Sequence, residues 1–167
     1  MFDPWNGVRR LLLVCVDALP EEVEPALSCL HDALPGVHLT LWAAPELHEA
    51  ATALPGVAAL LPAPGEWLDD LAQTVAVIRD GRYDAALILS APGHSPYGAA
   101  YACYLAGVPV RLGQSAEFGG AVLSHCVIPP AFAVPPVDYH LHLVSRLLQP
   151  RREREVAPEP AGHGPIP

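Results

Sequence analysis

The sequence predicts an α/β fold, in which a doubly wound, mostly parallel sheet carries helices on both faces. One observation is a set of short, continuous apolar runs such as "LLLVCV" at 11–16, which suit strands that are buried on both sides. These runs also alternate with segments whose apolar residues recur every three or four positions, as they do in helices. Finally, 167 residues, about half of them apolar, suit one domain with its own core.

Each element can be justified in chain order. Five apolar runs predict strands, at 11–16, 38–42, 57–61, 85–89 and 108–112. Helical spacing predicts helices at 23–34, 45–54, 66–80, 99–107 and 140–148. The first helix has one apolar stripe, formed by Val23, Leu27, Leu30 and Leu34. Strands that alternate with helices, joined by right-handed crossovers, give the parallel sheet.

Glycines and prolines predict where regular structure stops. Gly81 is expected to end the helix at 66–80. The run "IPPAFAVPP" at 128–136 predicts an extended connector. The segment "PRREREVAPEPAGHGPIP" is charged, rich in proline and glycine, and has no apolar face. We therefore expect one domain at 1–149 and a disordered tail at 150–167.

Charge and cysteine content narrow the classes of function. The formal net charge of −9 disfavours a nucleic-acid partner. Free thiols in a reducing compartment are favoured, because no C-x-x-C spacing joins the cysteines, Cys15, Cys29, Cys103 and Cys126. The six apolar residues after Arg10 fall short of a signal peptide, and no run approaches the roughly 18 residues of a membrane span. A cytoplasmic protein is expected, with peripheral contact at a membrane surface left open.

Two long stretches carry a family resemblance. The first runs from 9 to 62 and begins "RRLLLVCVDALPEEVEPALSCLHDALPG". The second runs from 83 to 125 and contains "SAPGHSPYGAAYACYLAGVPVRLGQ". Both resemble the ADP-heptose:lipopolysaccharide heptosyltransferase family, which is glycosyltransferase family nine. The first resembles its opening strand and "LDALGD" turn, and the second its later "SPY-AAY-CYLAGIP-R-G" stretch. Together they extend over about residues 9 to 148.

The resemblance implies one half of the two-domain GT-B architecture, a Rossmann-like domain. In this family the N-terminal half receives the acceptor and supplies the catalytic base, and the C-terminal half holds the nucleotide-sugar. The chain resembles the N-terminal half and ends where a linker to the donor domain is expected. The implied partners are a glycan or lipid-linked saccharide acceptor and a donor-domain protein. The implied process is lipopolysaccharide biosynthesis at the cell envelope, and no cofactor is expected.

The turn "VDALPE" at 16–21 is the first candidate site. The family's base is the last Asp of "LDALGD", so the resemblance places Asp17 at the first Asp and Glu21 in the position of the base. Pro20 replaces a glycine, which removes a backbone N–H and forbids a positive φ, and the turn is two residues shorter than in typical members. The alternative is that Glu21, Glu22 and Glu24 only favour the positive end of a helix dipole.

The loop "SAPGHSPYG" at 90–98 is the second candidate. It follows a predicted strand at its carboxyl end, where open α/β sheets bind ligands. Ser95 and Pro96 suit a helix N-cap and first turn, whose free N–H groups can hold an anion. His94 and Tyr97 suit a sugar or a phosphate. The alternative is a capped helix without a ligand.

The segment "VRLGQSAEFGG" at 110–120 supplies Arg111, Gly113, Gln114 and Glu117, of which Arg111 and Gln114 are the candidate binding residues. By the resemblance, this region borders the acceptor cleft, and its basic residues meet acidic groups of the acceptor. A structural arginine at a strand end is the alternative for Arg111. No metal site is expected, since His140 and His142 fall on different faces of a helix. No dinucleotide or Walker loop is present.

Two classes of function follow from these observations. In the first, the chain is the acceptor-binding half of a glycosyltransferase whose donor half is on another chain or was removed, and it is not catalytic alone. In the second, it is a non-catalytic relic of that fold that binds a glycan or a protein. The altered "VDALPE" turn favours the second class for this chain by itself.

Overall fold

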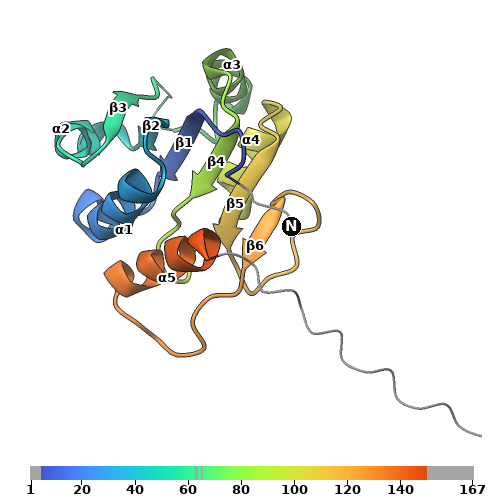
Figure 1. The fold of residues 1–167 in the computed structure, drawn as a ribbon. Coiled ribbons are helices and arrows are strands. Elements are labelled where there is room, and N and C mark those ends of the chain that lie inside the picture. Colours follow the sequence, from blue (N-terminus) through green and yellow to red (C-terminus); the bar gives the residue numbers. More distant parts are fainter. Residues whose placement is uncertain (1–4, 63, 65, 150–167) are drawn as a thin grey trace, which may run out of the picture.

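One six-stranded sheet forms the centre of the protein. The computed structural model describes residues 5–62, 64 and 66–149, so the tail predicted at 150–167 lies outside the described residues. The strands have the spatial order β3-β2-β1-β4-β5-β6, and every neighbouring pair is parallel (Figure 1). Their bounds are β1 Arg10–Cys15, β2 His38–Ala43, β3 Val57–Leu60, β4 Ala85–Ile88, β5 Val110–Gln114 and β6 His125–Val127. The predicted α/β, Rossmann-like class is confirmed.

Helices cover both faces of this sheet. Their bounds are α1 Pro20–Ala33, η1 Pro45–Leu47, α2 His48–Thr52, α3 Leu71–Gly81, α4 Tyr97–Leu105 and α5 Pro136–Leu148. Figure 1 shows α1 and α5 side by side on one face, with α3 and α4 on the other. The sequence alternation of a strand decides which core each side chain joins. Leu11 and Leu13 of β1 pack under α1 and α5, whereas Leu12 and Val14 pack under α3 and α4.

The strand register brings distant loops to one edge of the sheet. Val14 of β1 lies opposite Ile88 of β4, and the Leu89 N–H donates to the Val14 oxygen at 2.9 Å. β1 and β4 therefore end at the same level, and β5 ends beside them. The turn at 16–19 and the loop at 90–96 meet there. This carboxyl edge is where an open α/β sheet binds ligands.

The two ends of the described fold also meet. The Trp5 indole N–H donates to the main-chain oxygen of Leu147 at 3.0 Å, across 142 positions of sequence. Trp5 packs against the core under α1 and α5. The segment before β1 is thereby tied to the last turn of α5.

Several predicted boundaries are wrong, each for a local reason. β6 was not predicted, because three residues are too short to show a period. α5 begins at Pro136 and not at 140, since a proline at the first helical position needs no N–H donor. α3 begins at Leu71, where the Asp70 side chain accepts a hydrogen bond from the Gln73 N–H. Gly81 is its last residue, and Arg82 takes the left-handed conformation, with φ of 49°.

Candidate functional site at the carboxyl edge of the sheet

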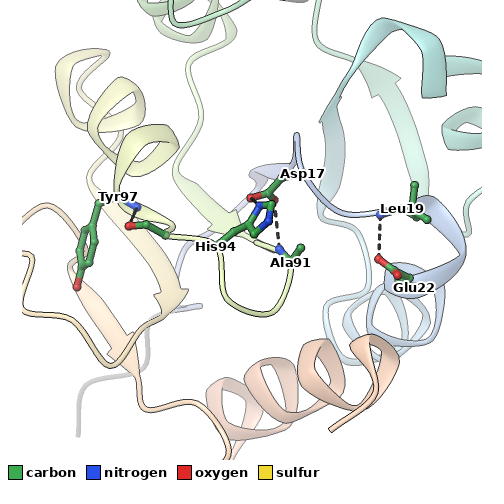
Figure 2. A network of polar contacts seen from close by, with 7 residues as sticks. Asp17, Leu19, Glu22, Ala91, His94 and Tyr97 are labelled. Carbon is green, nitrogen blue, oxygen red and sulfur yellow. Dashed lines mark hydrogen bonds and ion pairs between the residues drawn. The ribbon is translucent and has the colours of Figure 1, made fainter. Parts of the chain in front are cut away.

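A carboxylate and an imidazole connect the ends of β1 and β4. Asp17 follows β1, and His94 lies in the loop after β4 (Figure 2). The Asp17 Oδ2 atom is 3.1 Å from His94 Nδ1, and the Ala91 N–H donates to Asp17 Oδ1 at 3.2 Å. Both loops therefore share one hydrogen-bonded centre, as is expected for loops that follow neighbouring parallel strands.

The geometry of this pair defines what the imidazole can do. When Asp17 accepts from Nδ1–H, the other ring nitrogen, Nε2, is the one free to accept or donate. The side chains are 59% exposed for His94 and 27% exposed for Asp17, so solvent screens the pair. Asp17 is therefore a hydrogen-bond partner of His94 at the surface.

The two glutamates at the start of α1 differ in role. The Glu22 carboxylate accepts a hydrogen bond from the Leu19 N–H at 3.1 Å, which fixes the start of the helix (Figure 2). Pro20 occupies the first helical position. Glu21 is exposed, and it does not line the pocket described below. This placement favours the helix-start interpretation of the acidic turn, and the catalytic role of Glu21 stays a prediction.

An open pocket of about 270 Å³ lies beside His94. Its wall is built by the segments 93–95 and 114–117 together with Pro129 and Tyr139. These come from the ends of β4 and β5, the connector after β6, and the first turn of α5. His94, Ser95 and Gln114 were predicted as binding residues, and the fold brings all three into one wall.

Ser95 and Tyr97 hold the loop that follows β5. The Ser95 hydroxyl donates to the Glu117 carboxylate at 3.1 Å, and it accepts a long bond, 3.4 Å, from the Tyr97 N–H. The Tyr97 hydroxyl donates to the Glu117 main-chain oxygen at 2.9 Å. In Figure 2, Tyr97 lies apart from the Asp17–His94 pair. Pro96, and not Ser95, is the N-cap of α4. The Ser95 hydroxyl, just before that helix, is already hydrogen-bonded to the Glu117 carboxylate.

The Arg111 side chain is hydrogen-bonded to main-chain oxygens of the protein itself. The side chain is buried, and its guanidinium donates to four main-chain oxygens, those of Val108, Pro109, Ala121 and Val122. The guanidinium carbon also lies 5.2 Å from the centre of the Tyr104 ring. Arg111 does not line the pocket. The geometry favours the structural alternative for this residue.

Gln114 is a buried polar residue in the wall of the pocket. It is 3% exposed, and its Nε2 donates to the Tyr139 main-chain oxygen at 2.9 Å. Because a carbonyl only accepts, that bond identifies which end of the amide carries the oxygen. The Oε1 atom is buried from solvent and has no hydrogen-bond partner among the described residues. A buried acceptor without a donor is unfavourable.

His140 follows Tyr139 on α5. It is fully buried, and neither ring nitrogen has a hydrogen-bond partner among the residues that the structure describes. Burial lowers the pKa of the His140 imidazole, an effect that the Glu22 and Asp17 carboxylates oppose. His142 instead reaches the Ile128 main-chain oxygen at 3.0 Å through Nε2. No group of three or more His, Cys, Asp or Glu residues suited to a metal ion exists within 5–62, 64 and 66–149.

Known protein structures match the fold of this chain over most of its length. A glycosyl transferase family 9 structure from Veillonella parvula DSM 2008 gives a TM-score of 0.67 at 16% identity and covers 83% of this chain. E. coli heptosyltransferase WaaC with ADP gives 0.65 at 15% identity over 83%, and E. coli ADP-heptose lps heptosyltransferase II gives 0.60 at 17% identity over 81%. The chain shares the fold of part of each of these structures.

This chain, in turn, matches less than half of each known structure. The chain spans 41%, 46% and 40% of the lengths of those three structures, in the order given. No family model and no curated protein matches the sequence. The predicted resemblance is thus confirmed at the level of the heptosyltransferase fold. Within the part of the chain that the structure describes, no helix is both long and apolar enough to span a bilayer.

The sequence analysis named Glu117 but did not identify Ser115 and Tyr139 as parts of the site. Ser115 and Glu117 follow β5 directly, so the rule that identified the loop after β4 applies to them as well. Tyr139 contributes its main-chain oxygen to Gln114. A main-chain contact leaves no signal in the residue type.

Proposed function

We propose that this chain is the acceptor-binding half of a sugar-transfer system and does not catalyse transfer by itself. The observation that carries the proposal is the pocket of about 270 Å³ at the carboxyl edge of a sheet with the heptosyltransferase fold. Its wall presents an imidazole, two hydroxyls, an amide and a carboxylate, which are the groups that bind sugar hydroxyls. The process is transfer of a sugar from a nucleotide-sugar to a cell-envelope glycan such as lipopolysaccharide, on the cytoplasmic side.

The first turn of α1 supports a binding role over a catalytic one. A general base must come within hydrogen-bond reach of the hydroxyl it deprotonates. Glu21 occupies the position of the base in the resemblance but lies outside the pocket wall, and the adjacent Glu22 is used as a cap. A binding half that has lost, or never had, the base is the consistent interpretation.

Exposed apolar side chains beside the pocket support a protein partner. Phe118 is 99% exposed and Phe132 84% exposed, and Ile128 is also exposed. Phe118 follows pocket residue Glu117, and Ile128 precedes pocket residue Pro129. Apolar side chains gathered around a binding site are typical of interaction surfaces. A donor-domain protein that closes over the pocket fits this position.

A reconstituted assay tests the proposal. Alone, the chain should bind saccharides but bind ADP-heptose weakly or not at all by calorimetry, and it should transfer no sugar. Mixed with the donor domain of a related heptosyltransferase, it should still transfer little. Restoring glycine at Pro20, aspartate at Glu21 and two residues in the turn should raise transfer.

Two results would contradict parts of this proposal. Transfer by the unaltered mixture that Glu21→Gln abolishes would show that "VDALPE" is a working active-site turn. Micromolar binding of ADP-heptose to the chain alone would show that the nucleotide-sugar is bound here and not by a partner.

A further inference from the structure

The charges around the pocket decide which saccharides it can take. The chain has no lysine, and its nine cationic side chains are all arginines. Three of these, at 151, 152 and 154, lie outside the described residues. The described ones are Arg9, Arg10, Arg79, Arg82, Arg111 and Arg146, and none lines the pocket.

The described arginines are held elsewhere in the fold. Arg10 begins β1 and Arg82 precedes β4, so both lie at the amino edge of the sheet, opposite the pocket. Arg79 donates to the Leu105 main-chain oxygen, and Arg111 donates to its four main-chain oxygens. Arg146 is seven residues beyond Tyr139 on α5, which is about 10 Å along the helix.

The groups that do face the pocket are acidic or neutral. Glu117 brings a carboxylate into the wall, and Asp17 lies behind His94 with a second one. His94 is the single lining side chain among the described residues that can become a cation, and Asp17 offsets its charge. A phosphate or carboxylate placed here would face Glu117, and no guanidinium of the described residues lines the pocket to pair with it.

The polar groups of the wall suit hydroxyls. The Ser115 hydroxyl, the Glu117 carboxylate and His94 Nε2 offer donors and acceptors. A sugar hydroxyl both donates and accepts, so it can satisfy groups of either kind. The volume of about 270 Å³ is just below the roughly 300–1,000 Å³ of drug-sized sites, so one ring-sized group fits.

We infer that the pocket binds a saccharide ring that carries no phosphate or carboxylate. This inference rests on the proposed function and specifies its ligand. It departs from the family resemblance, which implies an acidic acceptor met by basic residues. The resemblance would supply Arg111 as the cation. The Arg111 guanidinium, however, is hydrogen-bonded to main-chain oxygens within the fold.

The test compares matched ligands on the full chain. Methyl glucoside and glucose 6-phosphate are titrated separately while the amide resonances of 93–95 and 114–117 are followed by NMR. Methyl glucoside should shift these resonances in the millimolar range, and glucose 6-phosphate should bind about tenfold more weakly. Added salt should narrow this difference, because it screens the repulsion.

Two variants assign the effect to named groups. Glu117→Gln should bring the two affinities closer together, since it keeps the bond from Ser95 but removes the charge. Glu46→Gln removes an equal charge from the remote η1 and should leave the ratio unchanged.

The outcomes separate the two proposals. If glucose 6-phosphate binds as tightly as methyl glucoside or more tightly, the inferred ligand class is wrong while saccharide binding stands. If neither ligand shifts the pocket resonances, both the ligand class and the proposed saccharide-binding function are wrong.

Discussion

The ring of Tyr97 fills the space where residue 119 would carry a side chain. A Cβ built on Gly119 would lie 1.8 Å from the nearest Tyr97 ring carbon. The same tyrosine donates its hydroxyl to the Glu117 main-chain oxygen. Tyr97, the first residue of α4, therefore packs against the loop after β5. This contact and the hydrogen bond fix the position of Glu117, a residue of the pocket wall.

Gly119→Ala should destabilise the protein by about 1–3 kcal/mol, because the ring must move and its hydrogen bond is lost. Urea unfolding followed by circular dichroism measures the change. The matched control is Gly120→Ala, where a Cβ would contact nothing within 4 Å but a φ of +61° still adds strain. A Tyr97→Ala background should remove most of the cost of Gly119→Ala. Additive costs in the double variant would argue against the contact.

Adjacent glutamates at the start of α1 offer a second prediction. Glu22→Ala should cost about 1 kcal/mol of the free energy of unfolding, because it removes the acceptor of the Leu19 N–H. Glu21→Ala should cost less, because Glu21 shares the helix-dipole term but has no hydrogen bond within the described residues. Thermal unfolding of the two variants gives the comparison. Equal losses would mean that the dipole, and not the cap, accounts for the acidic turn.

Replacement of Arg111 should harm the fold and leave the ligand preference unchanged. Arg111→Met leaves four main-chain oxygens without a charged donor, so we expect a loss of about 3 kcal/mol. Arg111→Lys should recover only part of it, since an ammonium cannot reproduce the planar donor set. Arg79→Lys, which alters one exposed bond, is the control. If a destabilised but folded Arg111 variant lost saccharide binding, Arg111 would belong to the site after all.

Stability should depend on pH through His140. Its pKa is lowered in the fold from an ordinary value near 6.5, so the unfolded chain binds more protons below that pH. The free energy of unfolding should be highest above pH 6.5. It should decrease as the pH falls below 6.5 and through the lower pKa that His140 has in the folded protein. His140→Leu should remove this part of the pH dependence, and His38→Gln, at an exposed position, should retain it. Unfolding in denaturant at several pH values measures it, and parallel curves for wild type and His140→Leu would contradict the assignment.

The core of the fold could be predicted because its signal is local. Apolar runs identify the strands, and a stripe such as that of α1 identifies a helix face, so the order of elements and the meeting of Asp17 with His94 follow from the rules of parallel sheets. β6 could not be predicted, since "HCV" is short and lies at the edge of the sheet. The free thiols also divide in a way that the sequence does not show: Cys15 and Cys103 are buried, and Cys29 and Cys126 are exposed.

The role of Arg111 could not be predicted for a different reason. Whether an arginine faces a ligand or the backbone depends on how many main-chain oxygens lie within its reach, and here these come from 108–109 and 121–122. That number depends on the path of the β5–β6 loop, which the sequence does not encode locally. Likewise, nothing in the residue type of Tyr139 indicated that its carbonyl would hold Gln114.

The hydrogen bond between Trp5 and Leu147 brings the two ends of the described fold together. The order in which the chain connects its strands and helices can therefore be changed by design. Because the first and last elements of the fold meet, a short linker could join them and the chain could be opened at another surface loop without changing the order of the strands. Opening it at the exposed glycine–alanine junction of 120–121 would yield a circular permutant. In such a molecule, a fused domain would be attached beside the β5–β6 loop and the pocket, in place of the Trp5–Leu147 junction.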